Sequence, residues 1–306
     1  MNKYVATIGM FDGVHLGHQF VLRHVAECAK KRGLSSMAIT FDNPLPLTSS
    51  LPSTLTPLEA KLLLISKLPI DHVEVLSFTE ELKRMTAHQF MQQVLKEQLN
   101  VCVLLIGYDN RFGYNREEGF DDYVRYGQEL GIEVISLPPT PVQLSLPLSD
   151  SGSLPLSSSL IRRLLKEGCV HEAAEGLGHP YAIIGYVEHG EHIGTRLGFP
   201  TANLVPIDAR QLIPAPGVYA VKVRLEHSME EKHAMMNIGH RPTFDGHRLT
   251  LEVHIFQLHE NLYGQQLLVS FIGRLRDEQR FDSIDALKAQ LAQDRIMADA
   301  IFHNEQ

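Results

Sequence analysis

The N-terminal segment places two histidines and three glycines where a predicted strand turns into a helix. Residues 9–18 read GMFDGVHLGH and follow an apolar stretch over 4–9. Backbone N–H groups at a helix start carry partial positive charge, and glycine lets an anion approach the backbone closely. His15 and His18 add side-chain donors at the same place. The pattern therefore predicts a phosphate site that stabilises charge on a triphosphate leaving group.

Two other interpretations of this histidine pair compete with a phosphate site. Histidines three positions apart are commonly ordinary surface residues, and they also serve as metal ligands. No third ligand of clear spacing accompanies His15 and His18, which weakens the metal interpretation. The order strand, glycine turn, histidine pair, helix weakens the surface interpretation.

A second polar run, IGYDNRFG at 106–113, follows a predicted strand over 101–107. Ligands bind at the carboxyl ends of parallel strands in open α/β sheets. Asp109 and Arg111 are therefore candidate ligand contacts, with a charged surface turn as the alternative.

A serine run before a predicted helix supplies a third candidate phosphate site. Ser157, Ser158 and Ser159 can cap a helix over 158–168, and free amides at a helix start attract anions. Arg162 adds a fork of charged donors suited to phosphate. Taken alone, such a run also fits an ordinary helix cap.

The C-terminal half carries the string GFPTANL at 198–204. Thr201 and Asn203 alternate along an extended segment, so both can present oxygens to one side and hold Mg²⁺. Gly190 and Gly194 precede them and allow a loop to fold over a nucleotide, which Pro200 would also contact.

The first 137 residues alternate strands and helices, which predicts a doubly wound parallel sheet with right-handed crossovers. The expected strands are 4–9, 35–41, 73–78, 101–107 and 132–137, and the expected helices are 19–32, 87–99 and 120–130. We expect the helix over 158–168 to close this first domain, which spans residues 1–176.

Beyond residue 177 the pattern changes to short strands separated by Gly, Pro and Asn turns, which predicts a small antiparallel barrel. The expected strands are 182–188, 217–225, 234–238, 249–256 and 266–272, and a terminal helix is expected over 283–302. This second domain spans residues 177–306, so the chain is an α/β protein with two different folds.

Composition narrows the classes of partner. A chain of 306 residues suits two domains, and its formal net charge of -8 argues against a general nucleic-acid surface. The three cysteines form no CxxC pair, which favours a reducing compartment. No apolar run is long enough to span a bilayer, so we expect a cytoplasmic protein with no membrane partner.

These strings together resemble the bacterial family of bifunctional riboflavin kinases and FAD synthetases. GMFDGVHLGH resembles the FAD synthetase branch of the HxGH nucleotidyltransferases, and IGYDNRFG and SSSLIR resemble two further motifs of that branch. GFPTANL resembles the signature of riboflavin kinases, and PGVYA at 216–220, NIGHRPTF at 237–244 and LEVH at 251–254 follow it in the family's order.

The resemblance implies two reactions that both consume ATP. The C-terminal domain would phosphorylate riboflavin to FMN with Mg²⁺, and the N-terminal domain would join FMN to AMP, releasing pyrophosphate. Riboflavin, FMN and ATP are thus the expected small-molecule substrates, and no protein partner is predicted.

The resemblance also implies a role for each candidate residue. Glu252 is the general base of the kinase, Arg276 and Phe281 border the flavin ring there, and Asp109 and Arg111 hold FMN in the other domain. The implied ATP contacts of the adenylyltransferase are Gly9, Phe11, Gly13, His15, Gly17, His18, Ser157, Ser158, Ser159 and Arg162.

Two departures from the family pattern keep alternatives open. The segment FDNPLP at 41–46 lacks a histidine that the family usually has, and Leu160 stands where arginine is common. One alternative is therefore a riboflavin kinase with an impaired or altered N-terminal domain. The other is a flavin-binding regulator, against which the presence of Thr201, Asn203 and Glu252 speaks.

Overall fold

The computed structural model describes the chain as two compact units. It covers residues 2–42, 54–107, 110–139, 143–144, 154–189, 198–243, 246–258 and 260–304. Among these, the residues up to Ser158 form unit 1 and those from Ser159 onward form unit 2.

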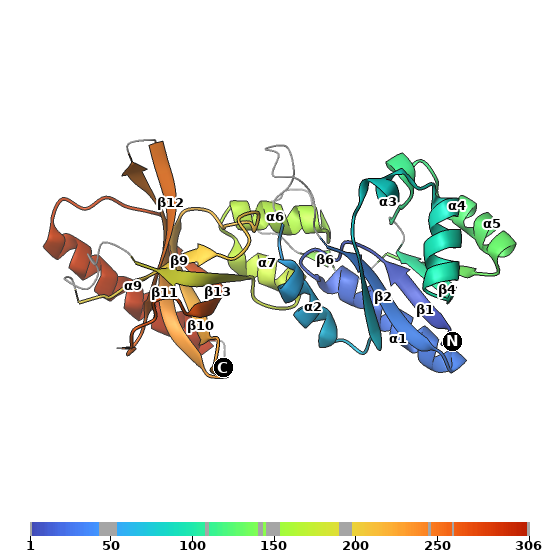
Figure 1. Ribbon diagram of the computed structural model, residues 1–306. Helices are drawn as coiled ribbons and strands as arrows, with labels where there is room; N and C mark the ends of the chain where they lie inside the picture. The colour runs from blue at the N-terminus through green and yellow to red at the C-terminus, as the bar shows by residue number, and fades with distance from the viewer. Residues whose placement is uncertain are drawn as a thin grey trace. The chain divides into compact units, whose positions relative to one another are not determined.

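Unit 1 is built on a five-stranded parallel sheet with the strand order β3-β2-β1-β4-β5 (Figure 1). The strands are β1 (Tyr4–Ile8), β2 (Ser35–Phe41), β3 (His72–Leu76), β4 (Val101–Gly107) and β5 (Glu133–Leu137). Each corresponds to a strand expected from an apolar stretch of the sequence. The first strand lies at the centre, so the turn that follows it opens at the middle of the sheet's carboxyl edge.

Helices cover both faces of this sheet, as a doubly wound fold requires. On one face, Val5, Val103 and Leu105 pack with Val25 and Ala29 of the first helix. On the other face, alternate strand residues pack with two helical segments. The helices are α1 (Leu16–Arg32), α2 (Leu58–Ser66), α3 (Glu80–Arg84), α4 (Ala87–Gln89) continuing as the π-helix η1 (Phe90–Gln98), and α5 (Phe120–Leu130).

Several short elements were not expected from the sequence. Both α2 and α3 occupy the connection between β2 and β4 on either side of β3, and η2 (Tyr114–Arg116) follows β4. The stretch expected to be a loop over 138–155 contains a two-stranded pair, β6 (Gln143–Leu144) and β7 (Leu154–Pro155).

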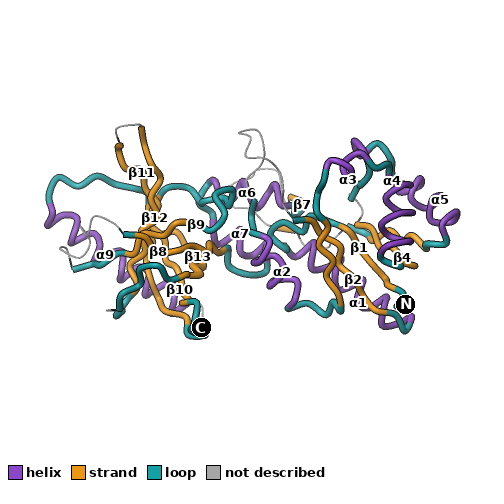
Figure 2. The backbone as a smooth tube through the Cα atoms, viewed as in Figure 1, coloured by secondary structure: helices purple, strands orange, loops and turns teal. Residues whose placement is uncertain are grey.

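Unit 2 is a closed antiparallel barrel with the order β10-β11-β12-β9-β8-β13. Its strands are β8 (Ala182–Glu188), β9 (Ala202–Pro206), β10 (Gly217–Leu225), β11 (Glu231–Thr243), β12 (Gly246–Ile255) and β13 (Gln266–Arg276). The terminal helix α9 (Ile284–Asn304) lies against the barrel (Figure 2). Its Ala298 and Phe302 pack with Val218 of β10 and Met235 of β11. The predicted barrel and terminal helix are therefore confirmed, with β9 as a sixth strand.

In the sequence, two helices follow the last strand of the parallel sheet and precede the barrel, and both belong to unit 2. These are α6 (Ser158–Lys166), of which all but the first residue belongs to unit 2, and α7 (Val170–Leu177), which packs against β13. The Leu165 carbonyl accepts a hydrogen bond from Ala215 N at 3.0 Å, and the Glu167 carbonyl accepts one from Arg274 Nη1 at 3.4 Å. The end of α6 is thus hydrogen-bonded to residues of unit 2, while the assignment of this helix to the first domain stays a prediction.

Candidate active sites

The turn after β1 has an unusual backbone. Phe11 and Val14 have φ of 47° and 41°, and Gly13 has φ of 84°. The left-handed region costs energy for residues with a Cβ, most of all for a β-branched one such as valine. Both side chains are buried, at 3% and 1% exposure, so core packing holds them in place.

Asp12 holds this turn by accepting backbone hydrogen bonds. Its Oδ1 accepts from Leu55 N at 2.9 Å and from Thr56 N at 3.1 Å, and Gly13 N donates to Thr56 Oγ1 at 3.1 Å. The Ser158 hydroxyl donates to the Asp12 carbonyl at 2.9 Å. Ser158 of the serine run therefore contacts the backbone of the glycine turn.

The two histidines of the turn lie face to face. His15 caps α1, with its Nδ1 accepting from His18 N at 3.3 Å. The rings stack with 3.6 Å between centroids, and Phe11 meets the His18 ring edge-on at 5.4 Å. Gly17 lies in the first helical turn, and the structure thus places Phe11, Gly13, His15, Gly17 and His18 together at one helix start.

Burial keeps His18 neutral. It lowers the pKa of His18 well below its ordinary value, and the nearby His15 and Lys61 lower it further. Within the described part of the chain, no hydrogen-bond partner reaches the buried Nδ1 of His18. A buried ring nitrogen without a partner fits a ligand contact. The described residues hold no group of three or more potential metal ligands, so the geometry gives the metal interpretation no support.

Lys61 of α2 belongs to the same site, although sequence reasoning did not select it. Its side chain is 4% exposed, and Nζ donates to the carbonyls of Phe41 at 2.9 Å and Met10 at 3.2 Å. Burial lowers the pKa of Lys61 to about 8, against the opposing effect of Asp12 and Asp42. A lysine inside the apolar run LEAKLLLIS was the available signal, because lysine is seldom buried without a function.

A cavity of about 490 Å³ lies at the carboxyl ends of the first four strands of unit 1. Its walls are largely aromatic: Phe41 and Phe78 meet edge-on at 5.3 Å, and Phe90 and Phe112 lie 5.6 Å apart. Its remaining lining residues include Gly9, Met10, Met85, Gly113, Asn115 and the cationic Lys83, Arg111 and Arg116. An aromatic slot with a cationic rim suits a flat ring that carries an anionic tail.

The structure places two of the predicted contacts on this cavity. Gly9 and the exposed Arg111 line it. Asn110 anchors the loop by donating to the Ile8 carbonyl at 2.5 Å. Asp109 lies outside the described residues. Within unit 2, Ser159 is exposed and Arg162 is half-buried on α6.

The second candidate site is a row of polar residues across the barrel. Asn203 of β9 is registered opposite Glu252 of β12 and opposite Glu188 of β8, and Glu252 is registered opposite Asn237 of β11. Directly opposed residues in a ladder point to the same face. Thr201, Asn203 and Glu252 are each half-buried. The row therefore brings the side chains of Asn203 and Asn237 to the same face as the carboxylates of Glu188 and Glu252.

His254 fixes the strand that carries this row. Its Nδ1 lies 2.8 Å from the Pro200 carbonyl, and its ring packs edge-on against Phe199 at 5.2 Å. Burial lowers the pKa of His254. The GFPTANL string is thereby held against β12 from Phe199 to Asn203, while Gly190 and Gly194 lie outside the described residues.

Arg276 forms an ion pair with Asp294 of the same chain. Its Nε and Nη2 each donate to the Asp294 carboxylate at 2.8 Å, and Asp294 is fully buried on α9. Gln290 donates to the same carboxylate at 2.8 Å. Phe281 lies 5.7 Å from the guanidinium. Arg276 thus joins the end of β13 to the terminal helix, and its predicted contact with flavin stays a prediction.

Comparison with known proteins divides the chain in the same way. The family model described as FAD synthetase matches residues 1–145, and the model described as riboflavin kinase matches residues 177–302. The bifunctional riboflavin kinase/FMN adenylyltransferase of Escherichia coli K12 is 38% identical over 97% of this chain and 92% of its own length. The protein of the same name from Listeria monocytogenes is 35% identical over 99% and 93%.

A solved structure from Streptococcus pneumoniae, titled a macrolide-efflux protein, is 30% identical and superposes with a TM-score of 0.84 over 98% of this chain and 95% of its own. In the part of this chain that the structure describes, no helix is long and apolar enough to cross a membrane. The likeness extends over both units.

Proposed function

This chain belongs to the bifunctional riboflavin kinase/FMN adenylyltransferase family, and from this premise we propose how its residues divide the two reactions. The enzyme phosphorylates riboflavin to FMN and adenylylates FMN to FAD, consuming ATP in each step. We assign the adenylyltransferase to residues 1–176 and the kinase to residues 177–306. The matched ranges 1–145 and 177–302 support this division, and α6 and α7 fall between them or at their margin.

In the adenylyltransferase, we assign the aromatic cavity to the flavin ring of FMN and the α1 turn to the phosphates of ATP. The FMN phosphate oxygen attacks the α-phosphorus of ATP, and the bond to pyrophosphate breaks. Phosphate is already anionic, so the step needs no general base. The work of the protein is to orient the reactants and to stabilise the departing pyrophosphate.

The α1 turn supplies donors suited to that leaving group. The histidine pair stacks at this helix start, and the buried amine of Lys61 is near enough to lower the pKa of His18. His18 is neutral, so it offers a single N–H without placing a second cation beside Lys61. Asp109 and Arg111 would hold FMN, and the serine run with Arg162 would contact ATP.

In the kinase, we assign Glu252 as the general base. Its carboxylate would take the proton of the riboflavin 5′-hydroxyl as that oxygen attacks the γ-phosphorus of ATP, releasing ADP. Thr201 and Asn203 would hold Mg²⁺, for which their oxygens and the neighbouring carboxylate are suitable donors. The cation neutralises phosphate charge when bound. Arg276 and Phe281 would border the flavin, and Gly190, Gly194 and Pro200 the nucleotide.

The observation that carries the kinase assignment is the register that sets Glu252 directly beside Asn203. We would give the purified chain riboflavin, ATP and Mg²⁺, or FMN, ATP and Mg²⁺, and separate the flavins by chromatography. Glu252→Gln should slow FMN formation by about a hundredfold or more and leave FAD formation from FMN intact. His18→Ala should have the opposite pattern, with a loss of about a hundredfold in FAD formation only.

Two matched controls accompany these variants. Glu188 is the other carboxylate registered opposite Asn203, and it is exposed, so Glu188→Gln should retain riboflavin phosphorylation. His24 lies on α1 beyond the histidine pair, with its Nδ1 against the Phe20 carbonyl at 2.8 Å, so His24→Ala should retain FAD formation. Full kinase activity in Glu252→Gln would rule out its role as base.

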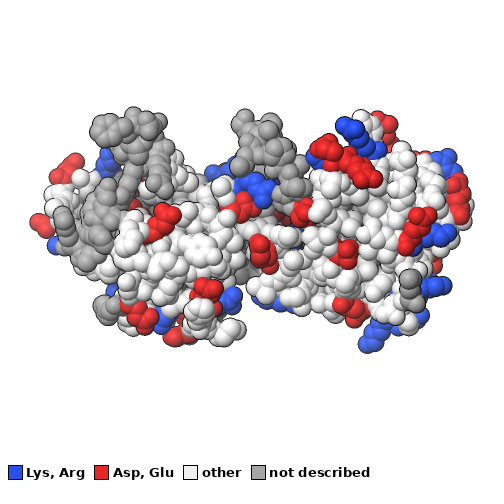
Figure 3. All heavy atoms as spheres, in the orientation of Figure 1, with Lys and Arg blue, Asp and Glu red and all other residues white. Residues whose placement is uncertain are grey.

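We further propose that the enzyme acts in the cytoplasm and binds no nucleic acid. The three cysteines are free thiols, which suits a reducing compartment. On the face drawn in Figure 3, acidic and basic side chains are interspersed and do not gather into a basic patch.

A further inference from the structure

One wall of the flavin cavity is a loop that connects β4 to α5. Its residues Arg111, Phe112 and Gly113 line the cavity, while Met85 and Phe90 line it from around the start of the helical segment 87–98. These two walls come from parts of the chain that are far apart in the sequence. The width of the slot therefore depends on what joins the loop to the helix.

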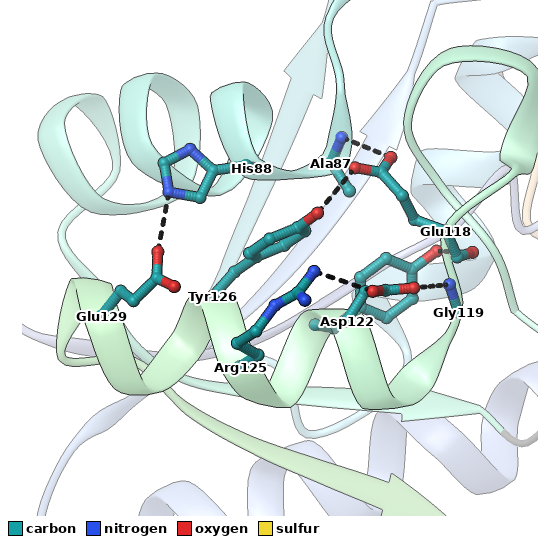
Figure 4. A network of polar contacts seen from close by, with 9 residues as sticks. Ala87, His88, Glu118, Gly119, Asp122, Arg125, Tyr126 and Glu129 are labelled. Carbon is teal, nitrogen blue, oxygen red and sulfur yellow. Dashed lines mark hydrogen bonds and ion pairs between the residues drawn. The ribbon is translucent and has the colours of Figure 1, made fainter.

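Glu118 makes that connection behind the wall (Figure 4). Its Oε2 accepts a hydrogen bond from Ala87 N at 2.8 Å, and its Oε1 accepts one from the Tyr126 hydroxyl at 3.2 Å. Ala87 is fully buried at the first residue of α4, where a carboxylate also complements the helix dipole. One half-buried side chain thus joins the loop to α4 and to α5.

The carboxylate is packed directly against the cavity wall. A Cβ added to Gly113 would lie 2.6 Å from Glu118 Oε2 and 2.7 Å from Ala87 N, and Gly113 has φ of 93°. Only glycine fits there without displacing the hydrogen bond. The position of the lining residue Gly113 and the Glu118–Ala87 contact are therefore set together.

Tyr123 holds the same loop from the α5 side. Its hydroxyl accepts from Phe112 N at 3.0 Å and lies 3.0 Å from the carbonyls of Phe112 and Glu118, to one of which it donates. The Tyr123 ring is fully buried and stacks on the Phe112 ring at 4.2 Å. Tyr123 thus holds the loop at Phe112 and at Glu118, and its ring fixes the orientation of the Phe112 ring, which lines the cavity.

We propose that Glu118 is a positioning residue for FMN: it holds the loop 110–119 against α4, so that the slot is formed before the flavin enters. The proposal rests on the assignment of this cavity to FMN. Without the carboxylate, the loop would adopt several arrangements, of which only one binds FMN. The apparent affinity for FMN would then fall in proportion to the fraction of molecules whose loop has that arrangement. The chemistry at the phosphates, which Glu118 does not touch, would continue once FMN is bound.

The test is steady-state FAD formation by the full chain at varied FMN and saturating ATP. Glu118→Ala should raise the KM for FMN by about tenfold and change kcat by less than about twofold. The free-energy cost of ordering the loop would reduce FMN binding and would not affect the chemical step. Glu118→Gln should restore a KM near that of the wild type, since its amide oxygen still accepts from Ala87 N and its NH₂ group can donate to Tyr126.

Glu129→Ala is the matched control. Glu129 lies on α5, near Tyr126, and its carboxylate pairs with His88 at 3.3 Å in the same network (Figure 4). It does not contact the loop 110–119 in any described interaction. Its KM for FMN should be that of the wild type. Riboflavin phosphorylation by each variant reports whether unit 2 of the same molecules is intact.

Phe112→Ala separates failure of this inference from failure of the cavity assignment. A raised KM for FMN in Phe112→Ala with an unchanged KM in Glu118→Ala would overturn the positioning role and leave the cavity assignment standing. Unchanged KM values in both would overturn the assignment of the cavity to FMN. A fall in kcat that Glu118→Gln shares with Glu118→Ala, at constant KM, would also contradict positioning.

Discussion

The imidazole of His18 stacks on that of His15, with 3.6 Å between the ring centroids and 19° between the ring planes. Protonation of His18 would place a cation against this ring and near the amine of Lys61, which is why both groups lower the pKa of His18 further. His18 therefore presents a neutral ring, held against that of His15, at the start of α1. If the α1 turn binds ATP as proposed, this ring would meet the triphosphate without having to reorganise during the reaction.

The neutral His18 makes stability depend on pH. Its folded-state pKa lies below the unfolded value of 6.5, so the unfolded chain binds more protons in acid. The contribution of the neutral His18 to the free energy of unfolding is fully present above about pH 6.5. It is lost as the pH falls, by up to about 1.4 kcal/mol per pH unit. Urea midpoints measured by circular dichroism at pH 7.5 and 5.5 should show a smaller fall for His18→Gln than for the wild type or His24→Ala. Equal falls would contradict a buried neutral His18.

Lys61 should add a descending limb to the pH profile of FAD formation and have no effect on the pH profile of riboflavin phosphorylation. Its amine is charged below about pH 8 and neutral above it, and its charge reaches the α1 turn closely enough to affect His18. We expect kcat/KM for FAD formation to fall as the pH rises through about 8, because positive potential at the leaving group is lost. Lys61→Met should lower the rate at pH 7 by about tenfold or more and remove the limb. Riboflavin phosphorylation, measured in the same samples, should show neither effect.

The Arg276–Asp294 pair allows a test of what Arg276 does. Asp294→Ala leaves a guanidinium that is only 13% exposed without its buried partner, which should destabilise unit 2 by about 3 kcal/mol in urea unfolding. The double variant Arg276→Met, Asp294→Leu should recover most of that stability, because an apolar pair replaces a buried ion pair.

Kinase activity of that double variant separates the two roles of Arg276. If Arg276 acts only by holding α9, restoring stability should restore the KM for riboflavin. If it also borders the flavin ring, the KM should stay raised despite normal stability. FAD formation from FMN should be unaffected by any of these changes, and its loss would contradict the assignment of this pair to the kinase alone.

The sequence was most informative where one short segment contains a whole structural device. The strand, glycine turn, histidine pair and helix of residues 4–32 all lie in order along the chain. The positive φ of Phe11 and Val14 within the turn does not follow from residue type and was not predicted. Alternation of strands and helices likewise predicted the parallel sheet. The barrel was predicted from short strands, but β9 was not among them; only an extended segment containing Thr201 and Asn203 was predicted there.

What escaped prediction depends on contacts between distant positions. Lys61 lies 51 residues from the Met10 carbonyl that it binds, and Glu118 lies 31 residues from Ala87. Nothing in the spacing of the sequence announces such pairs. The apolar stripe of α6 likewise indicates that the helix is buried, but it does not indicate which unit buries it.

The two sheets differ in how they end. The barrel closes on itself through β8 and β13, so its backbone hydrogen bonds return to their own sheet, whereas the parallel sheet ends at β3 and β5. Among the described residues, each of those outer strands has a strand partner on one side only, and an unpaired strand edge is a known route to aggregation. Both carry acidic or ionisable residues, among them His72, Glu74 and Glu133, which discourage such pairing. Pairing at these edges would remove both activities together, because the two units belong to one chain.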